Sequence, residues 1–167
     1  HNRKVTDISP LKSAINMDRL EIHECTISDL TALAGMKNLK TLTAQRNRIS
    51  DLSPLAGLTN LRSLDLYGNT ITDLSPLAGL KQLTRLHLRS NPKLTRAEID
   101  KLKQALPNCV IMHDLMNEAE AWEEAIRRHL KKPGGEIPQE DMAKLRSFSI
   151  HNRKVTDISP LKSAINM

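Results

Sequence analysis

The sequence predicts an α/β solenoid, with short parallel strands on a concave face, 3₁₀ or turn segments on a convex face, and helical caps. Three observations predict it. Leucines recur every 22 residues through the middle of the chain, at Leu20, Leu42, Leu64 and Leu86. Apolar residues make up 39% of the chain but aromatic residues only 2%, which indicates stacked aliphatic layers. Helical spacing of apolar residues begins only after Asn91. One such repeat cannot bury its apolar face alone, so neighbouring coils must stack.

Each repeat begins with a predicted strand and continues into a predicted tight turn. Leu64-x-Leu66 shows the alternation of a strand that buries one face. Apolar residues then follow at every third position, which is the spacing of a 3₁₀ turn. In the segment SPLAGL at 75–80, Pro76 lies early in the turn, where no N–H donor is needed. Gly79 allows the chain to return closely.

An asparagine occupies the same place in consecutive repeats, at Asn47, Asn69 and Asn91. Its amide can both donate and accept, so a buried column of asparagines can satisfy loop backbone groups in neighbouring coils. The motif L-x-x-L-x-L-x-x-N at 61–69 and 83–91 resembles the signature of internalin-type leucine-rich repeat proteins of the 22-residue class. The resemblance is strong over about residues 17–94 and implies protein–protein recognition by a bacterial protein. Cys25 replaces the asparagine in the first full repeat.

The segments that resemble caps occur in an unusual order. Thr95 can cap a helix with Glu98 at its third position, and a final strand is expected at 109–113, as in a carboxyl-terminal cap. An amphipathic helix over 118–132 and a strand at 148–150 follow, and they resemble an amino-terminal cap. In an ordinary protein of this type, residues 118–167 would precede residue 18.

The two ends of the chain are identical. Residues 1–17 and 151–167 both read HNRKVTDISPLKSAINM, whereas the internal repeats have diverged. Joining residue 167 to residue 18 would continue the 22-residue period without a break. We therefore interpret the chain as an engineered circular permutant with its first half-repeat at both ends. The predicted organisation is a first half-repeat (1–17), leucine-rich repeats (18–94), a C-terminal-type cap (95–114), a linker with an N-terminal-type helical cap (115–150), and the second half-repeat (151–167).

The first functional prediction is self-assembly. Two copies of one segment cannot fill the same slot, so we expect domain-swapped, head-to-tail oligomers, as rings or fibres, or switching between two frames. Three alternatives stay open: the cap folds back on its own chain, one copy is idle, or it packs as an extra half-coil. The residues expected to carry assembly are His1, Val5, Ile8, Leu11, Trp122, Ile126, Leu130, Phe148, Ile150, Val155, Ile158 and Leu161.

The alternative function is recognition of another protein on the concave face. Strand residues that flank the buried leucines point to that face, and tyrosine and arginine are common anchors of interfaces. The candidates are Arg19, Glu21, His23, Gln45, Asp65, Tyr67, Arg85, His87 and Arg89.

Other functional classes lack support in the sequence. It contains no catalytic, phosphate-binding or cofactor-binding motif, so we expect no enzyme activity and no cofactor. The net charge is +6, but basic residues occur singly or in pairs, which does not favour nucleic-acid binding. His1 or His151 beside His23 lacks further metal ligands. Cys25 and Cys109 are expected to be small buried hydrophobes. No signal peptide or membrane-spanning run is evident, and the cellular location is not indicated.

Overall fold

The computed structural model describes residues 5–115 and 125–131. The chain divides into two compact units, His1–Asp114 and Leu115–Met167. The five strands in the described residues all lie in the first unit. In the second unit, residues 125–130 are helical, within the helix expected at 118–132.

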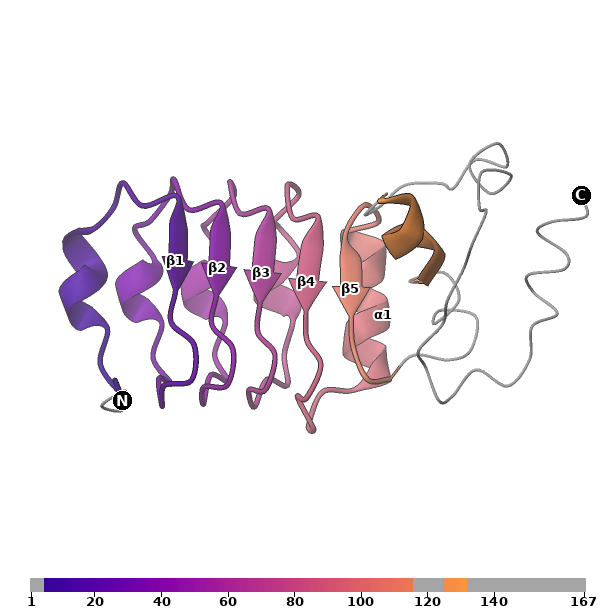
Figure 1. Ribbon diagram of the computed structural model, residues 1–167, viewed down its shortest axis with the longest axis horizontal. Coiled ribbons are helices and arrows are strands. Elements are labelled where there is room, and N and C mark those ends of the chain that lie inside the picture. The colour runs from indigo at the N-terminus through magenta and orange to yellow at the C-terminus, as the bar shows by residue number, and fades with distance from the viewer. Residues whose placement is uncertain (1–4, 116–124, 132–167) are drawn as a thin grey trace, which may run out of the picture. The chain divides into compact units, whose positions relative to one another are not determined.

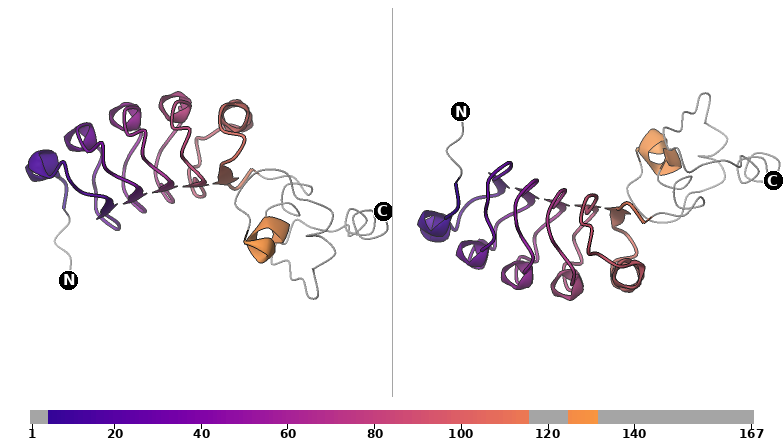
Figure 2. Two further views of the ribbon diagram at one scale, coloured as in Figure 1. Left: turned by 90° about the horizontal axis from the view of Figure 1, so that it is seen from above. Right: turned by 90° about the horizontal axis from the view of Figure 1, so that it is seen from below.

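The first unit is built on a parallel sheet of five strands in the order β1-β2-β3-β4-β5 (Figure 1). The strands are β1 (Arg19–Glu21), β2 (Thr41–Thr43), β3 (Ser63–Asp65), β4 (Arg85–His87) and β5 (Val110–Met112). Short 3₁₀ helices precede the first four strands: η1 (Ser9–Ser13), η2 (Thr31–Leu33), η3 (Ser53–Leu55) and η4 (Ser75–Leu77). The helix α1 (Arg96–Ala105) takes their place before β5. Figure 2 shows the strands along the inner side of the arc and the helices along its outer side. The predicted solenoid is therefore confirmed.

The strands pair in the register that the repeat period predicts. Leu20 pairs with Leu42, Leu42 with Leu64, and Leu64 with Leu86. Ile111 of β5 continues this column. All five side chains are buried. Fully burying a leucine side chain contributes roughly 1.5–3 kcal/mol, so each stacked column is a major part of the stability.

The asparagine column also forms as predicted. The Oδ1 atom of Asn69 accepts a hydrogen bond from the N–H of Ile49, at 3.0 Å, in the preceding coil. Its Nδ2 atom donates to the carbonyl of Ala44 in that coil, at 2.9 Å, and to Leu66 in its own coil, at 3.0 Å. Asn47 and Asn91 make the equivalent bonds. These amides join consecutive coils, and each one supplies an acceptor to a buried N–H of the preceding coil.

Aspartates start the convex turns. The carboxylate of Asp51 accepts hydrogen bonds from the backbone N–H of Ser53, at 2.8 Å, and from its hydroxyl. Asp7, Asp29 and Asp73 do the same with the residue two positions later. Hydrogen bonds to the carboxylate favour its charged form, so the pKa of each of these four groups is below its ordinary value. The recurring aspartates are therefore structural turn residues.

The residue before each asparagine position adopts a left-handed conformation. Its φ is 57° at Glu24, 51° at Arg46, 67° at Gly68 and 58° at Ser90. Only one of these four residues is glycine, although glycine alone adopts this conformation without a steric cost. The stacked coils therefore impose the same tight corner on side chains that do not favour it.

The two ends of the sheet differ in how they are covered. At the β5 end, Thr95 caps α1 by accepting a hydrogen bond from the N–H of Glu98, at 3.3 Å, as the sequence predicts. Ile99 and Leu102 of α1 are buried in the core. At the other end, β1 is an edge strand. One expectation needs correction: Cys25 and Cys109 are only partly buried. Both lie in end coils, where a neighbour is present on one side.

Candidate protein-binding surfaces

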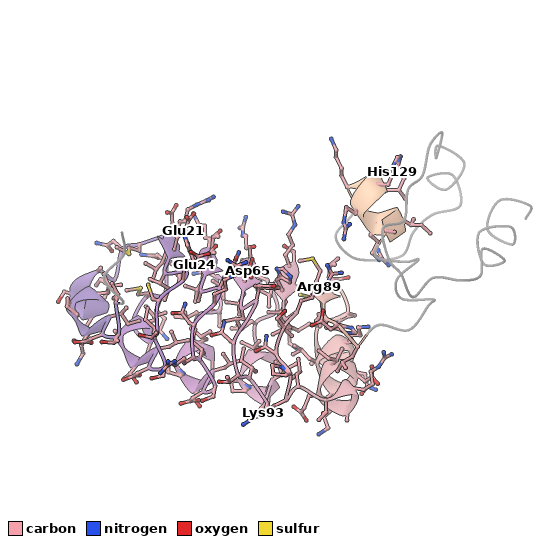
Figure 3. The ribbon with its side chains drawn as sticks, turned by 60° about the horizontal axis from the view of Figure 1, so that its bottom comes forward. Glu21, Glu24, Asp65, Arg89, Lys93 and His129 are labelled. Atoms are coloured by element: carbon pink, nitrogen blue, oxygen red, sulfur yellow. The ribbon has the colours of Figure 1, made fainter. Side chains whose placement is uncertain are left out.

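The concave face presents two polar rows, on either side of the buried leucine column. One row contains the residues that begin each strand, and the other contains the residues that end it. Their members are in register from strand to strand: Arg19, Thr41, Ser63 and Arg85 in the first row, and Glu21, Thr43, Asp65 and His87 in the second. On β5 the two rows end in apolar residues, Val110 and Met112. Figure 3 shows Glu21, Glu24, Asp65 and Arg89 along the same edge of the solenoid, with Lys93 at the opposite side.

Asp65 is the centre of a hydrogen-bonded network on this face. Its carboxylate accepts hydrogen bonds from Nε2 of Gln45, at 2.6 Å, and from the backbone N–H of Tyr67, at 3.0 Å. The Nδ1 atom of His87 lies 3.3 Å from each carboxylate oxygen. Burial opposes the charged form of Asp65, but the hydrogen bond from His87 and the other polar contacts outweigh it, so the pKa of this carboxyl is lowered. The network fixes three side chains, from coils β2 to β4, in one arrangement.

Aromatic and cationic side chains extend this network along the solenoid. The rings of Tyr67 and His87 lie 5.3 Å apart between centroids, at an interplanar angle of 43°. The guanidinium carbon of Arg46 lies 5.8 Å from the centroid of the Tyr67 ring, within the range of a cation–π contact. Arg46 also forms an ion pair with Glu24 at 2.6 Å. Within the described residues, the buried Nε2 atom of His87 makes no hydrogen bond.

The structure thus brings four predicted residues into contact, namely Gln45, Asp65, Tyr67 and His87. Among the remaining concave candidates, Arg19 and Glu21 of β1 and Arg85 of β4 are in register with the same rows. Arg89 lies on the same edge of the solenoid as Asp65 (Figure 3). The place of His23 on this face stays a prediction. Glu24 and Arg46 were missed by the sequence analysis. Their signal was available, because they are opposite charges one repeat apart, at the position before the asparagine column.

The second candidate surface is the open end of the first coil. Val5 is 46% exposed and Ile15 is 51% exposed, and Leu11, Ala14, Met17 and Ile22 are partly exposed. The residues one repeat later in the columns of Val5, Leu11, Ala14, Met17 and Ile22 are all fully buried: Ile27, Leu33, Met36, Leu39 and Ala44. These apolar columns are therefore buried where a preceding coil covers them. They are exposed or partly exposed on the first coil, where the described residues include no preceding coil.

The predicted assembly residues divide between described and undescribed parts of the chain. Ile8 is buried, Leu11 is partly buried and Val5 is exposed, all on the first coil. In the second unit, Ile126 is buried and Leu130 partly buried. The other predicted residues lie outside the described part: His1, Trp122, Phe148, Ile150, Val155, Ile158 and Leu161. The roles assigned to all of these residues stay predictions.

Metal binding, membrane insertion and thiol chemistry have little support in the described residues. Residues 5–115 and 125–131 contain no group of three or more His, Cys, Asp or Glu side chains arranged to hold a metal ion. The helices within the same ranges are too short or too polar to cross a lipid bilayer. Burial raises the pKa of the Cys109 thiol to about 12, which keeps it protonated and unreactive at neutral pH.

Comparison with known proteins agrees with this geometry. The family model described as Leucine Rich repeats (2 copies) matches residues 37–79 and 59–108. Internalin C2 from Listeria monocytogenes is 32% identical, with a TM-score of 0.62 over 66% of this chain and 47% of that chain. An internalin, InlF, from the same species is 30% identical, with a TM-score of 0.61 over 70% of this chain and 34% of that chain. The chain thus spans less than half the length of either internalin.

A more distant likeness concerns the fold alone. A chain of the Drosophila melanogaster SNF/U2A′ complex is 22% identical, with a TM-score of 0.51 over 74% of this chain and 77% of that chain. No curated protein matches the sequence. The repeats described above have the leucine-rich repeat fold.

Proposed function

We propose that this internalin-like leucine-rich repeat protein is a non-enzymatic scaffold that assembles with copies of itself through its duplicated segment. The observation that carries this proposal is the open first coil. Its apolar columns are exposed, whereas their equivalents one repeat later are fully buried. The sequence supplies a second, identical copy of this coil at 151–167, preceded by a segment that resembles an amino-terminal cap.

The identity of the two copies makes exchange between them nearly neutral in energy. Residues 5–17 contact the next coil through buried Ile8 and through a hydrogen bond from Thr26 N–H to the carbonyl of Val5, at 3.2 Å. The second copy has the same side chains and can make the same contacts. The second copy is preceded by the segment that resembles an amino-terminal cap, and this segment would cover the exposed columns.

Reach favours exchange between molecules over closure within one. Five parallel strands at about 4.8 Å spacing separate the two ends of the sheet by roughly 20 Å. The stretch 114–119, which would connect the last coil to the cap, spans at most about 20 Å when fully extended. Docking on another molecule requires no such extension. Because the contact is heterologous, its repetition gives a ring if it closes and a fibre if it does not.

The order of the segments also supports a circular permutation made by design. Residues 118–167 placed before residue 18 would give an uninterrupted 22-residue period, from the strand that the sequence predicts at 148–150 to β1. A natural repeat that is retained for its fold diverges at its exposed positions, whereas residues 1–17 and 151–167 agree at every position. We infer that the second copy was added to create two competing frames.

The test is the molar mass in solution, measured by light scattering after size exclusion over a range of concentrations. We expect discrete multimers or a mass that grows with concentration. A matched chain that ends at residue 150 should lose the multimers and keep the circular dichroism spectrum of the folded solenoid. A full-length monomer at every concentration would overturn the proposal.

A second function, recognition of another protein on the concave face, is favoured by the network around Asp65. Pre-ordered polar side chains lose little conformational entropy on binding, and Tyr67 offers an aromatic anchor beside the buried Nε2 atom of His87. Peptides selected for binding from a displayed library provide the test. Binding at this face requires that Tyr67→Ala and Arg89→Ala weaken it, and that removal of 151–167 leaves it unchanged.

A further inference from the structure

We infer that residues 147–149 of a second copy of this chain add to the free edge of β1 as a parallel strand, with residue 147 opposite Arg19, residue 148 opposite Leu20 and residue 149 opposite Glu21. This inference rests on the proposed self-assembly through the duplicated segment and specifies one contact that the exchanged segment brings with it. It extends the five-stranded sheet by one strand at the end where the core is exposed.

The register follows from the period and the duplication. Each strand from β1 to β4 pairs with the next at an offset of 22 residues, as Leu20 does with Leu42. Leu20 lies three positions after the end of the first copy at Met17. In the frame of the second copy, the position one period before Leu20 is Phe148. The strand Ser147-Phe148-Ser149-Ile150 therefore aligns with Arg19-Leu20-Glu21-Ile22, and the alternation of polar and apolar residues agrees at all four positions.

The backbone of β1 has an edge that can accept such a strand. The N–H groups of Ile22 and Glu24 donate to the carbonyls of Thr43 and Gln45, at 2.8 and 2.9 Å, on the β2 side. Because alternate residues of a strand direct their backbone groups to opposite edges, those of Arg19, Glu21 and His23 face away from β2. An unpaired strand edge is a template for the addition of another strand.

The side chains at this end complement the incoming strand. Leu20 is 8% exposed, whereas Leu42 and Leu64 are 0% and 1% exposed. Ile22 is partly exposed, and the residue one repeat later, Ala44, is fully buried. Phe148 and Ile150 would continue these two columns and cover them. The two serines would continue the polar rows of the concave face, beside Arg19 and Glu21.

A second strand could compete for the free edge of β1. This strand is β5 of another copy, which forms the opposite edge of the described sheet. That end offers less exposed apolar surface, because Leu106 and Ile111 are only 3% and 6% exposed. On the first coil, Val5 and Ile15 are 46% and 51% exposed. The columns exposed on the first coil would therefore find few apolar partners at the β5 end.

Disulfide trapping tests the strand and its register in the full chain. In a background with Cys25→Ala and Cys109→Ala, one chain carries Glu21→Cys and a second chain carries Ser149→Cys. Directly opposed residues of paired strands lie within the Cα separation of about 4.4–6.8 Å that a disulfide needs. We expect oxidation of the mixture to give a covalent dimer that contains one chain of each kind. The matched control replaces Ser149→Cys by Ser147→Cys, which is two residues out of register, and should form that dimer at least about tenfold more slowly.

Each outcome decides one part of the inference. Multimers by light scattering with no 21–149 cross-link would overturn the strand register but leave self-assembly intact. If both cysteines are placed in one chain, a cross-link found only within monomers would retain the register and overturn the second copy as its source. A monomer without cross-links would overturn both. Multimers that persist when the chain ends at residue 146 would assign the edge to β5 instead.

Discussion

The carboxylate of Asp65 lies 3.3 Å from Nδ1 of His87, one coil further along the solenoid. Both side chains are 24% exposed, so the contact is sheltered from solvent without being removed from it. Neither residue is apolar, yet together with Gln45 and Tyr67 they give the middle of the concave face a defined shape. This contact therefore links the stability of the solenoid to the surface that is available for recognition.

Asp65 makes the stability of the protein depend on pH in the acidic range. Its pKa is lowered from the ordinary value of 3.8 in the folded state. The unfolded chain therefore binds more protons near that pH, and the stability from this group is present above pH 3.8 and lost as the pH falls through the folded pKa. We expect Asp65→Asn to flatten the dependence of the unfolding free energy on pH below about pH 4, measured by urea unfolding at several pH values.

Glu21→Gln is the matched control for Asp65→Asn, because it removes one negative charge from the same face without contacting the Asp65 network. An identical change of slope in both variants would show that net charge, and not the contacts of Asp65, causes the effect.

Asn69→Ala should be among the most destabilising single substitutions in the solenoid. It leaves the buried N–H of Ile49 without a partner. The carbonyls of Ala44 and Leu66 each lose one of two donors and keep the other, Asn47 or Asn91. An unsatisfied buried group costs about 1–3 kcal/mol and a lost hydrogen bond about 0.5–1.5 kcal/mol, so we expect a loss of about 2–4 kcal/mol. Asn60→Ala is the control, because the exposed amide of Asn60 makes one bond, to the carbonyl of Lys37 at 2.9 Å, and should cost about 1 kcal/mol or less. Equal losses in chemical unfolding would contradict the role of the asparagine column.

The left-handed conformation shared by Gly68 and Ser90 predicts that substitutions at these two equivalent positions change the unfolding free energy in opposite directions. Gly68→Ala places a Cβ at a φ of 67° and 3.3 Å from Cγ of Arg46, and should destabilise the protein by about 1 kcal/mol. Ser90→Gly relieves the same conformation and keeps the backbone bond from residue 90 N–H to Asp114, at 2.6 Å. The relieved strain of about 1–2 kcal/mol exceeds the entropic cost of a glycine, about 0.5–1 kcal/mol, so the unfolding free energy should rise by about 0.5–1 kcal/mol. Thermal unfolding of both variants tests the pair, and a loss of stability in Ser90→Gly would refute it.

The sequence was sufficient to predict the solenoid because its signals repeat. The leucine columns, the asparagine column and the Thr95 cap each follow from local spacing, and the structure has all three. The contacts of the concave face were not predictable in the same way. The contact between His87 and Asp65 depends on the rotamers of both side chains. The contacts of Arg46 with Glu24 and Tyr67 depend on rotamers in the same way. Packing between coils selects these rotamers, and the spacing of residues in the sequence does not specify it. The partial exposure of Cys25 was missed because it depends on whether another coil covers the first one.

Assembly should depend on the apolar face of strand 147–150 and not on its polar face. Phe148→Asp would put a charge against the Leu20 column, and loss of a buried phenylalanine costs about 3–5 kcal/mol. Each 1.4 kcal/mol is about tenfold in affinity, so the dissociation constant of the multimer should rise at least about 100-fold. Ser147→Asp is the matched control, because it puts the same charge opposite Arg19 on the concave face, where cross-strand charge pairs are favourable. Analytical ultracentrifugation of both variants measures the difference. If Phe148→Asp assembles as well as the parent chain, this strand does not cover the first coil. If both variants are monomeric, added negative charge alone prevents assembly, and the sidedness of the strand is refuted.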